Sequence, residues 1–307
     1  MKSLIKIGTR GSKLALYQAE VVQVKLKTLF RLLECEFVKI HTKGDMIRHA
    51  AIESIGPGIF THEIEEALLA EEIDIAVHSA KDLATELPEG LEIGAMLMRE
   101  DARDCLVARE GKKLSQLDHG ARIGTSSLRR RAQLRKLRPD LEILEMRGNV
   151  DTRLKKIEQG KYDGIVLAHA GLKRLGLASS VTEVFEEENF LPQAGQGALA
   201  VEVRKGDLEI QELIKPLNHE PTFQRVSAER SFLRRLEGGC QIPAGVSSKI
   251  KGDVLTLKGA IFSLEGNLEV IDTLSGSVSE GEKTGVDLAE KLLRAGGDKI
   301  LKAIRNA

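Results

Sequence analysis

The stretch Ile123-Gly124-Thr125-Ser126-Ser127-Leu128-Arg129-Arg130-Arg131 joins a strand end, a glycine turn and the start of a helix. Ser126 or Ser127 is a good N-cap, and Arg138-Pro139 ends the predicted helix near Leu137. The three arginines therefore fall in the first turn, where free backbone amides and the helix dipole are already positive. Positive side chains are unfavourable at this position unless a carboxylate or phosphate binds there. The alternative is a solvated basic helix start.

The same stretch offers further groups for such an anion. Gly124 allows close approach of the backbone, Thr125 and the serines can donate hydrogen bonds, and arginine forks bind carboxylates in bidentate fashion. A second site follows in Arg147-Gly148-Asn149-Val150-Asp151-Thr152-Arg153, where Arg147 ends the strand-like run 141–146 and Arg153 opens the next helix. Two such sites close together predict a ligand with several negative groups.

Working outward, the N-terminal region has a similar plan. A strand at 4–7 leads through Gly8-Thr9-Arg10-Gly11-Ser12 into a helix at 14–29. The further predicted elements are strands at 36–41 and 73–77, a loop at 42–60, a helix at 61–69 with Thr61 as cap, and, in the second region, a helix at 151–159 and a strand at 163–168. Ile7-Gly8-Thr9 corresponds to Ile123-Gly124-Thr125, and the strand after Asp74 corresponds to that beginning at Asp163. We expect two α/β lobes of similar design.

The remaining segments complete the predicted organisation. Residues 191–203 begin as a glycine-rich hinge and end as a strand that returns the chain to the first lobe. A third region has a helix at 222–236, alternating segments at 246–250, 254–262 and 268–274, a hairpin turn at 265–267 and a last helix at 286–293. We expect domain 1 at 1–97 plus 197–215, domain 2 at 98–196, and domain 3, a small α+β domain with a three-stranded antiparallel sheet, at 216–307.

Composition excludes several classes of protein. The 307 residues are 42% hydrophobic and 30% charged, with zero formal net charge, no Trp and two Tyr. A general nucleic-acid binder is disfavoured because it needs basic surface and aromatic stacking. The three cysteines form no zinc or disulfide pattern, and no signal peptide or spanning apolar run is visible. We expect a cytoplasmic protein without a metal or membrane partner, and nothing demands more than a monomer.

Two further features carry chemistry. The predicted strand ending at Val77 delivers His78-Ser79-Ala80-Lys81-Asp82 at its carboxyl end, where open α/β sheets bind ligands. Lys81 and Asp82 could form a surface salt bridge, or Asp82 could hold a cationic nitrogen and move a proton. Cys240 could be a small buried apolar residue, but its glycine neighbours favour an exposed loop in which arginines would stabilise the thiolate.

With these motifs, the chain resembles the porphobilinogen deaminase (hydroxymethylbilane synthase) family over nearly its whole length. The motifs that carry the resemblance are Thr9-Arg10-Gly11-Ser12, Ala76 to Asp82, Gly124 to Arg130, Arg147 to Arg153, Ala170-Gly171-Leu172-Lys173-Arg174-Leu175-Gly176, Gln193-Ala194-Gly195-Gln196-Gly197 and Leu236-Glu237-Gly238-Gly239-Cys240. The resemblance implies two lobes of the type II periplasmic-binding-protein kind and a third domain that carries a cofactor cysteine.

The resemblance also implies the chemistry. Cys240 would hold a dipyrromethane through a thioether, and four porphobilinogen molecules would be joined head to tail on it, with loss of ammonia and final hydrolytic release. Asp82 would hydrogen-bond the pyrrole N–H groups and stabilise the cationic azafulvene. The residues implied to hold substrate and cofactor carboxylates are Arg10, Ser12, Ser79, Lys81, Thr125, Ser126, Ser127, Arg129, Arg130, Arg147, Arg153 and Arg174.

The chain departs from the family pattern in the loop before Phe60, which would cover the site. Many relatives have a lysine between glycines there, whereas this chain has Gly56-Pro57-Gly58. No role for a loop lysine is therefore expected. Two rival functions remain: a non-enzymatic sensor of polycarboxylates, and a phosphate or nucleotide enzyme, which is weakened by the absence of GxxxxGK[ST] and GxGxxG motifs.

Overall fold

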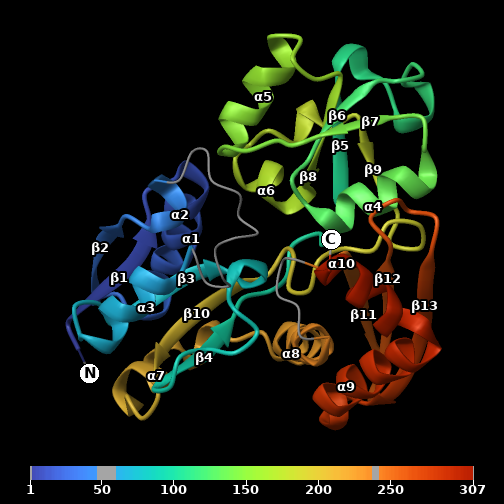
Figure 1. Ribbon diagram of the computed structural model, residues 1–307. Coiled ribbons are helices and arrows are strands. Elements are labelled where there is room, and N and C mark those ends of the chain that lie inside the picture. The colour runs from blue at the N-terminus through green and yellow to red at the C-terminus, as the bar shows by residue number, and fades with distance from the viewer. Residues whose placement is uncertain (1, 47–59, 237–241, 307) are drawn as a thin grey trace. The chain divides into compact units, whose positions relative to one another are not determined.

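In the computed structural model, residues 2–46, 60–236 and 242–306 are described (Figure 1). Contacts divide the chain into two compact units. The first contains Met1–Glu100 and Gly197–Phe223, and the second contains Asp101–Gln196 and Gln224–Ala307. The chain therefore passes twice between the units, at residues 100–101 and 196–197, before helix α8 enters the second unit at Gln224.

The first unit is an α/β lobe around a five-stranded sheet of order β2-β1-β3-β10-β4. Its strands are β1 (Leu4–Arg10), β2 (Glu34–Ile40), β3 (Ile75–Ser79), β4 (Leu91–Met96) and β10 (Leu199–Arg204). Its helices are α1 (Lys13–Leu29), α2 (Lys43–Met46), α3 (His62–Leu69) and α7 (Leu208–Ile214). Strand β1 pairs in parallel with β2 and β3, and β10 runs antiparallel between β3 and β4.

The second unit contains a lobe of the same strand order, β7-β6-β8-β5-β9. Its strands are β5 (Asp104–Ala108), β6 (Arg122–Gly124), β7 (Glu142–Leu144), β8 (Gly164–Ala168) and β9 (Glu183–Val184). Its helices are α4 (Leu128–Leu137), α5 (Val150–Glu158) and α6 (His169–Arg174). In each lobe the single antiparallel strand, β10 or β5, lies in the fourth position and comes directly after a passage between the units.

A matching pair of contacts supports the internal repeat. Asp74 accepts a hydrogen bond from the backbone N–H of Lys6 at 2.9 Å, and Asp163 accepts one from that of Arg122 at 2.8 Å. In return, the N–H groups of both aspartates donate to the carbonyls of the same partners at 2.9 Å. The correspondence predicted between the two Ile-Gly-Thr strands and between the two aspartate-led strands is therefore confirmed.

The small α+β domain lies in the second unit. Its antiparallel sheet is β11 (Ala244–Lys251), β12 (Val254–Phe262) and β13 (Glu269–Ser277), packed with α8 (Glu220–Arg235), α9 (Gly281–Leu292) and α10 (Asp298–Arg305). Phe232, Leu257 and Leu288 are fully buried in its core. The β12–β13 turn packs on α4, where Arg135 donates to the Leu264 carbonyl at 3.1 Å and Lys136 pairs with Glu269 at 2.5 Å.

The predicted fold class is confirmed: two α/β lobes of one design and a third domain with a three-stranded antiparallel sheet.

Several boundaries of the predicted helices and loops were wrong. Helix α2 lies inside the predicted loop, and the last helix begins at Gly281 and is followed by α10. Gly281 and Gly285 read as loop residues, but at Gly285 a Cβ would lie 2.2 Å from the Ala228 carbonyl oxygen, so close helix packing requires glycine. Pro57 lies outside the described residues.

Within the described part of the chain, no helix is both long and apolar enough to cross a bilayer.

Candidate active site

In the first unit, the predicted site residues gather at the carboxyl ends of β1 and β3. Ser12 is the N-cap of α1 and accepts from the Ala15 N–H at 3.2 Å. Ser79 ends β3 and accepts from Gln18 Nε2 at 2.8 Å, which ties the strand end to α1. The guanidinium carbon of Arg10 lies 4.4 Å from the ring centre of Phe60, a distance typical of a cation–π contact.

Lys81 and Asp82 follow directly on β3, in the short helical turn Ala80–Asp82. Both side chains are half-buried. Because β1 and β3 are parallel neighbours, Arg10 and Asp82 leave the same edge of the sheet. The position is the ligand edge of an open α/β sheet, as the sequence predicts.

In the second unit, the two halves of the stretch 123–153 lie side by side because β6 pairs with β7. Ser126 donates to the Met146 carbonyl at 2.7 Å and accepts from its N–H at 3.1 Å. Ser127 is the N-cap of α4 and accepts from the Arg130 N–H at 3.4 Å, which decides between the two predicted caps. The Thr125 hydroxyl accepts from the Ser127 N–H at 3.2 Å.

Three arginines of the predicted set lie on turns and helices at this end of the lobe. Arg147 pairs with Glu145 at 2.6 Å, Arg153 donates through Nε to the Gly148 carbonyl at 2.6 Å, and Arg174 ends α6. The first two contacts fold the arginines onto the turn between β7 and α5. Their interaction with a ligand carboxylate stays a prediction.

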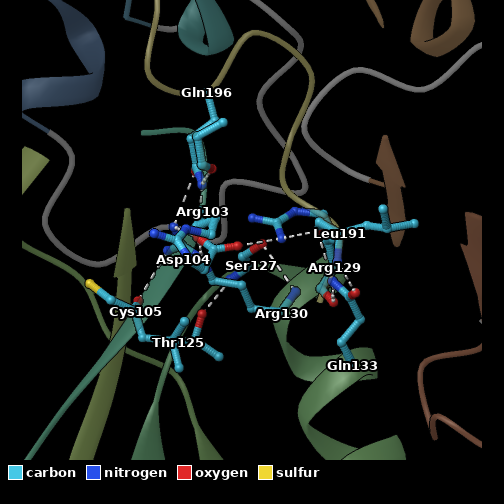
Figure 2. A network of polar contacts seen from close by, with 12 residues as sticks. Arg103, Asp104, Cys105, Thr125, Ser127, Arg129, Arg130, Gln133, Leu191 and Gln196 are labelled. Atoms are coloured by element: carbon cyan, nitrogen blue, oxygen red, sulfur yellow. Dashed lines mark hydrogen bonds and ion pairs between the residues drawn. The ribbon is translucent and has the colours of Figure 1, made fainter. Parts of the chain in front are cut away.

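Arg129 and Arg130 are buried around Asp104, a carboxylate that the sequence did not single out (Figure 2). Arg129 Nη1 lies 2.6 Å from Asp104 Oδ2. Arg130 Nη2 and Nε lie 2.6 and 3.0 Å from Asp104 Oδ1. The anion required by a basic helix start is thus supplied from within the chain, by the first residue of β5. The solvated alternative is wrong for these two arginines, which are 3% and 7% exposed.

The charge state of Asp104 follows from its neighbours. Complete burial acts to raise the pKa of its carboxyl group, but the charges of Arg129 and Arg130 outweigh burial and hold that pKa far below its usual range. Gln196 Nε2 donates to the same carboxylate at 3.0 Å. Asp104 is therefore ionised at neutral pH.

Packing supplies a reason for Gly124 besides the predicted approach of a ligand. A Cβ at this position would lie 2.6 Å from the Met146 methyl carbon and 3.0 Å from the Tyr162 ring. The glycine is required by packing between β6 and the side chains beside it. Close approach to a ligand is not needed to explain it.

A small hollow in the second unit joins α4 to the third domain. Its lining includes the polar side chains of Ser127 and Arg129 and the apolar side chains of Leu233, Ile242 and Ala244. Cys240 lies outside the described residues, but Leu233 and Ile242 stand on either side of it in the sequence.

The sequence also missed a buried ionisable cluster in the first unit. His78 Nε2 lies 3.0 Å from Glu202 Oε2, and Glu65 of α3 is 4% exposed nearby. Burial, followed by the charge of Glu202, raises the pKa of Glu65 against the opposing effects of Thr61 and His78. Thr61, the predicted side-chain cap of α3, makes no side-chain cap bond and instead hydrogen-bonds Glu65.

Fold and site define a two-lobed α/β protein with clustered arginines at the sheet edges and an added α+β domain. Two family profiles match it: "Porphobilinogen deaminase, dipyromethane cofactor binding domain" over residues 5–212 and "Porphobilinogen deaminase, C-terminal domain" over residues 223–294. The chain belongs to the porphobilinogen deaminase family, as the sequence motifs indicate.

Named relatives are similar along their whole length. Porphobilinogen deaminase of Carboxydothermus hydrogenoformans is 48% identical over 306 residues, which cover 99% of this chain and 98% of the relative. That of Syntrophotalea carbinolica is 49% identical over 98% of this chain and 96% of the relative.

Among solved structures, a Bacillus subtilis putative methionine-binding lipoprotein has a TM-score of 0.44 at 13% identity, with 72% of this chain and 92% of that chain covered. The Bordetella pertussis BvgS periplasmic VFT2 domain has a TM-score of 0.42 at 14% identity, with 69% and 85% covered.

Proposed function

We propose that this protein is a porphobilinogen deaminase that condenses four porphobilinogen molecules head to tail on a covalently bound dipyrromethane primer. Ammonia is lost at each addition, and hydroxymethylbilane is released by hydrolysis. The observation that carries the proposal is the similarity to relatives of that name along the whole chain, including both parts of the family profile.

Cys240 is the proposed attachment site of the dipyrromethane, through a thioether. Ser127 and Arg129 would hold its carboxylates, and Leu233 and Ile242 would contact its rings. These polar and apolar side chains line the same hollow. When bound, the dipyrromethane supplies the pyrrole end to which substrate is joined.

Asp82 is the proposed catalytic residue. A carboxylate at the end of β3 can accept hydrogen bonds from pyrrole N–H groups and stabilise the positive charge that develops on the substrate as ammonia leaves. It can also hold and return a proton. Half-burial supports this role because a partly dry site strengthens the interaction between the carboxylate and a cation.

The remaining predicted residues would hold carboxylates. Each porphobilinogen brings an acetate and a propionate, so the growing chain is a polyanion, and each charge-assisted hydrogen bond contributes about 1.5–3 kcal/mol. The residues of the first unit are Arg10, Ser12, Ser79 and Lys81. Those of the second unit are Thr125, Ser126, Ser127, Arg129, Arg130, Arg147, Arg153 and Arg174. Phe60, stacked under Arg10, would limit access of water.

The test is the intact mass of the purified protein, followed by peptide mapping around Cys240. We expect excess mass equal to two linked pyrroles on the Cys240 peptide. If Cys240 is unmodified, incubation with porphobilinogen must produce covalent uptake at that residue. Folded protein that takes up no porphobilinogen would overturn the proposal and favour a sensor of polycarboxylates.

The cytoplasmic location and the monomeric state expected from the sequence are part of the same proposal. Sedimentation velocity of the purified protein at several concentrations would check the second, and a concentration-dependent mass would contradict it.

A further inference from the structure

Asp104 connects more than the two arginines. It begins β5, four residues after the first passage of the chain between the units, and it is completely buried. Gln196 is the last residue before the second passage. Its side-chain N–H group donates to Asp104 Oδ1 at 3.0 Å and to the Ala102 carbonyl at 2.7 Å (Figure 2). One carboxylate and one amide therefore tie together the two connecting segments.

Helix α4 is bound to the second of these segments independently. Arg129 Nη1 donates to the Leu191 carbonyl at 2.6 Å, in addition to its contact with Asp104. Gln133, one turn further along α4, exchanges two bonds with Leu191, accepting from its N–H at 2.7 Å and donating to its carbonyl at 3.1 Å. The start of α4 thus contacts Asp104, Leu191 and Gln196 through buried polar groups.

Arg129 also lines the hollow beside Ser127, where the anion-binding function of α4 is proposed. A carboxylate bound there attracts the same guanidinium group that Asp104 and Leu191 share. An electrostatic bond between buried groups is strong and sensitive to a new charge within a few ångströms. Binding at the hollow must therefore alter how firmly α4 holds the two segments.

We propose that Asp104 is a positioning residue that couples anion binding at the start of α4 to the two connecting segments, residues 100–104 and 191–197. Asp104 holds Arg129 and Arg130 in place before the ligand binds. When the ligand weakens or strengthens these contacts, the hydrogen bond of Gln196 to Asp104 passes the effect to the two segments. The choice of ligand and the anion site at the start of α4 both rest on the proposed function.

The experiment is hydrogen exchange of peptides covering 98–104 and 189–198 in the full chain, purified with Cys240 unmodified, before and after incubation with porphobilinogen. Uptake of porphobilinogen is followed by mass in the same samples. In the wild type we expect the ligand to change exchange in both peptides. In Asp104→Asn, which keeps the shape and removes the charge, we expect uptake to persist and this ligand-induced difference to be lost.

A purely structural role predicts something else: Asp104→Asn would raise exchange with and without ligand, and the difference between the two states would remain. That result, or uptake in the wild type without any change in the two peptides, overturns the proposal. Absence of uptake in the wild type would instead refute the proposed function, so the two failures are distinguishable.

Two further variants complete the design. Asp163→Asn removes a carboxylate that pairs with Arg122 in the same unit, and it should leave the ligand-induced difference as in the wild type. Gln196→Met keeps the pairs of Asp104 with the arginines and removes the amide link. If Asp104→Asn does not fold, Gln196→Met decides: loss of the difference supports the coupling, and an unchanged difference overturns it.

Discussion

At the scale of single residues, the position of Asp82 in the fold could be predicted from the local sequence. Its position follows from the strand that precedes it, because β3 ends at Ser79 and the chain leaves the sheet at the ligand edge. Asp104 is the opposite case. It begins an ordinary buried strand, and only contacts with residues 25 and 26 positions away reveal its role.

We expect Asp82→Asn to lower turnover by about 10²–10⁴-fold while the fold is retained, because the amide cannot balance a developing cation or take up a proton. Initial rates of porphobilinogen consumption and a circular dichroism spectrum provide the measurement. Glu86→Gln, an exposed acid four residues later, is the matched control and should leave turnover unchanged. A sensor would lose only ligand affinity in the Asp82 variant.

The buried Glu65 predicts a pH dependence of stability. Its carboxyl pKa is raised in the folded protein above the usual glutamate value of 4.5, so the folded state binds this proton more tightly than the unfolded chain does. Below that value both states are protonated and Glu65 has no differential effect. As pH rises through the interval up to the raised pKa, the unfolded chain ionises first and stability falls.

The side chain in Glu65→Gln cannot ionise. The free energy of unfolding of this variant should therefore increase relative to that of the wild type as pH rises from 4.5 to 8. The groups that face Glu65 are Glu202, His78 and His62. Urea unfolding at intervals of pH is the measurement, and Glu66→Gln on the exposed side of the same helix is the control. A difference between Glu65→Gln and wild type that is constant with pH would contradict the assignment.

At the scale of elements, the turns after β1 and β6 combine capping with close packing. Ser12 and Ser127 cap the helices that follow, and Gly8 and Gly124 leave room for neighbouring side chains. The cap could be predicted because it depends on residues three positions apart. The packing reason for the glycines could not, because Met146 and Tyr162 reach Gly124 from other elements.

We expect Gly124→Ala to destabilise the protein by about 1–3 kcal/mol, the usual cost of overpacking a filled site. The Cβ would meet the Met146 methyl carbon at 2.6 Å. Gly11→Ala is the control, because nothing lies within 4 Å of the added Cβ and its φ is not positive. Urea unfolding compares the two, and equal stabilities would show that Met146 and Tyr162 move aside without cost.

At the scale of the whole molecule, the packing of the β12–β13 turn on α4 is one of the contacts that join the third domain to the second lobe. Gly266 makes this possible: its φ is +73°, and a Cβ there would lie 2.6 Å from both the Ala132 carbonyl oxygen and the Lys136 nitrogen. The contact joins the third domain to the helix that carries Arg129.

Gly266→Ala should therefore separate the unfolding of the third domain from that of the second lobe and lower the cooperativity seen by calorimetry. Gly252→Ala is a matched control, since Gly252 also has a positive φ, +60°, but has nothing within 4 Å of the added Cβ. Both variants bear the backbone cost of about 1–2 kcal/mol for a left-handed residue. A single transition in both would contradict the role assigned to the turn.

The sequence by itself determined the two α/β lobes, their repeat, the returning strand, the antiparallel third domain and the position of Asp82. These features depend on periodicity and on turn and cap residues close together in the chain. The tertiary structure decided what surrounds the arginines: Asp104, Gln196 and Leu191 come from segments distant in sequence. The charges of side chains follow from the sequence, but the residues that neutralise them are decided by how distant segments pack together.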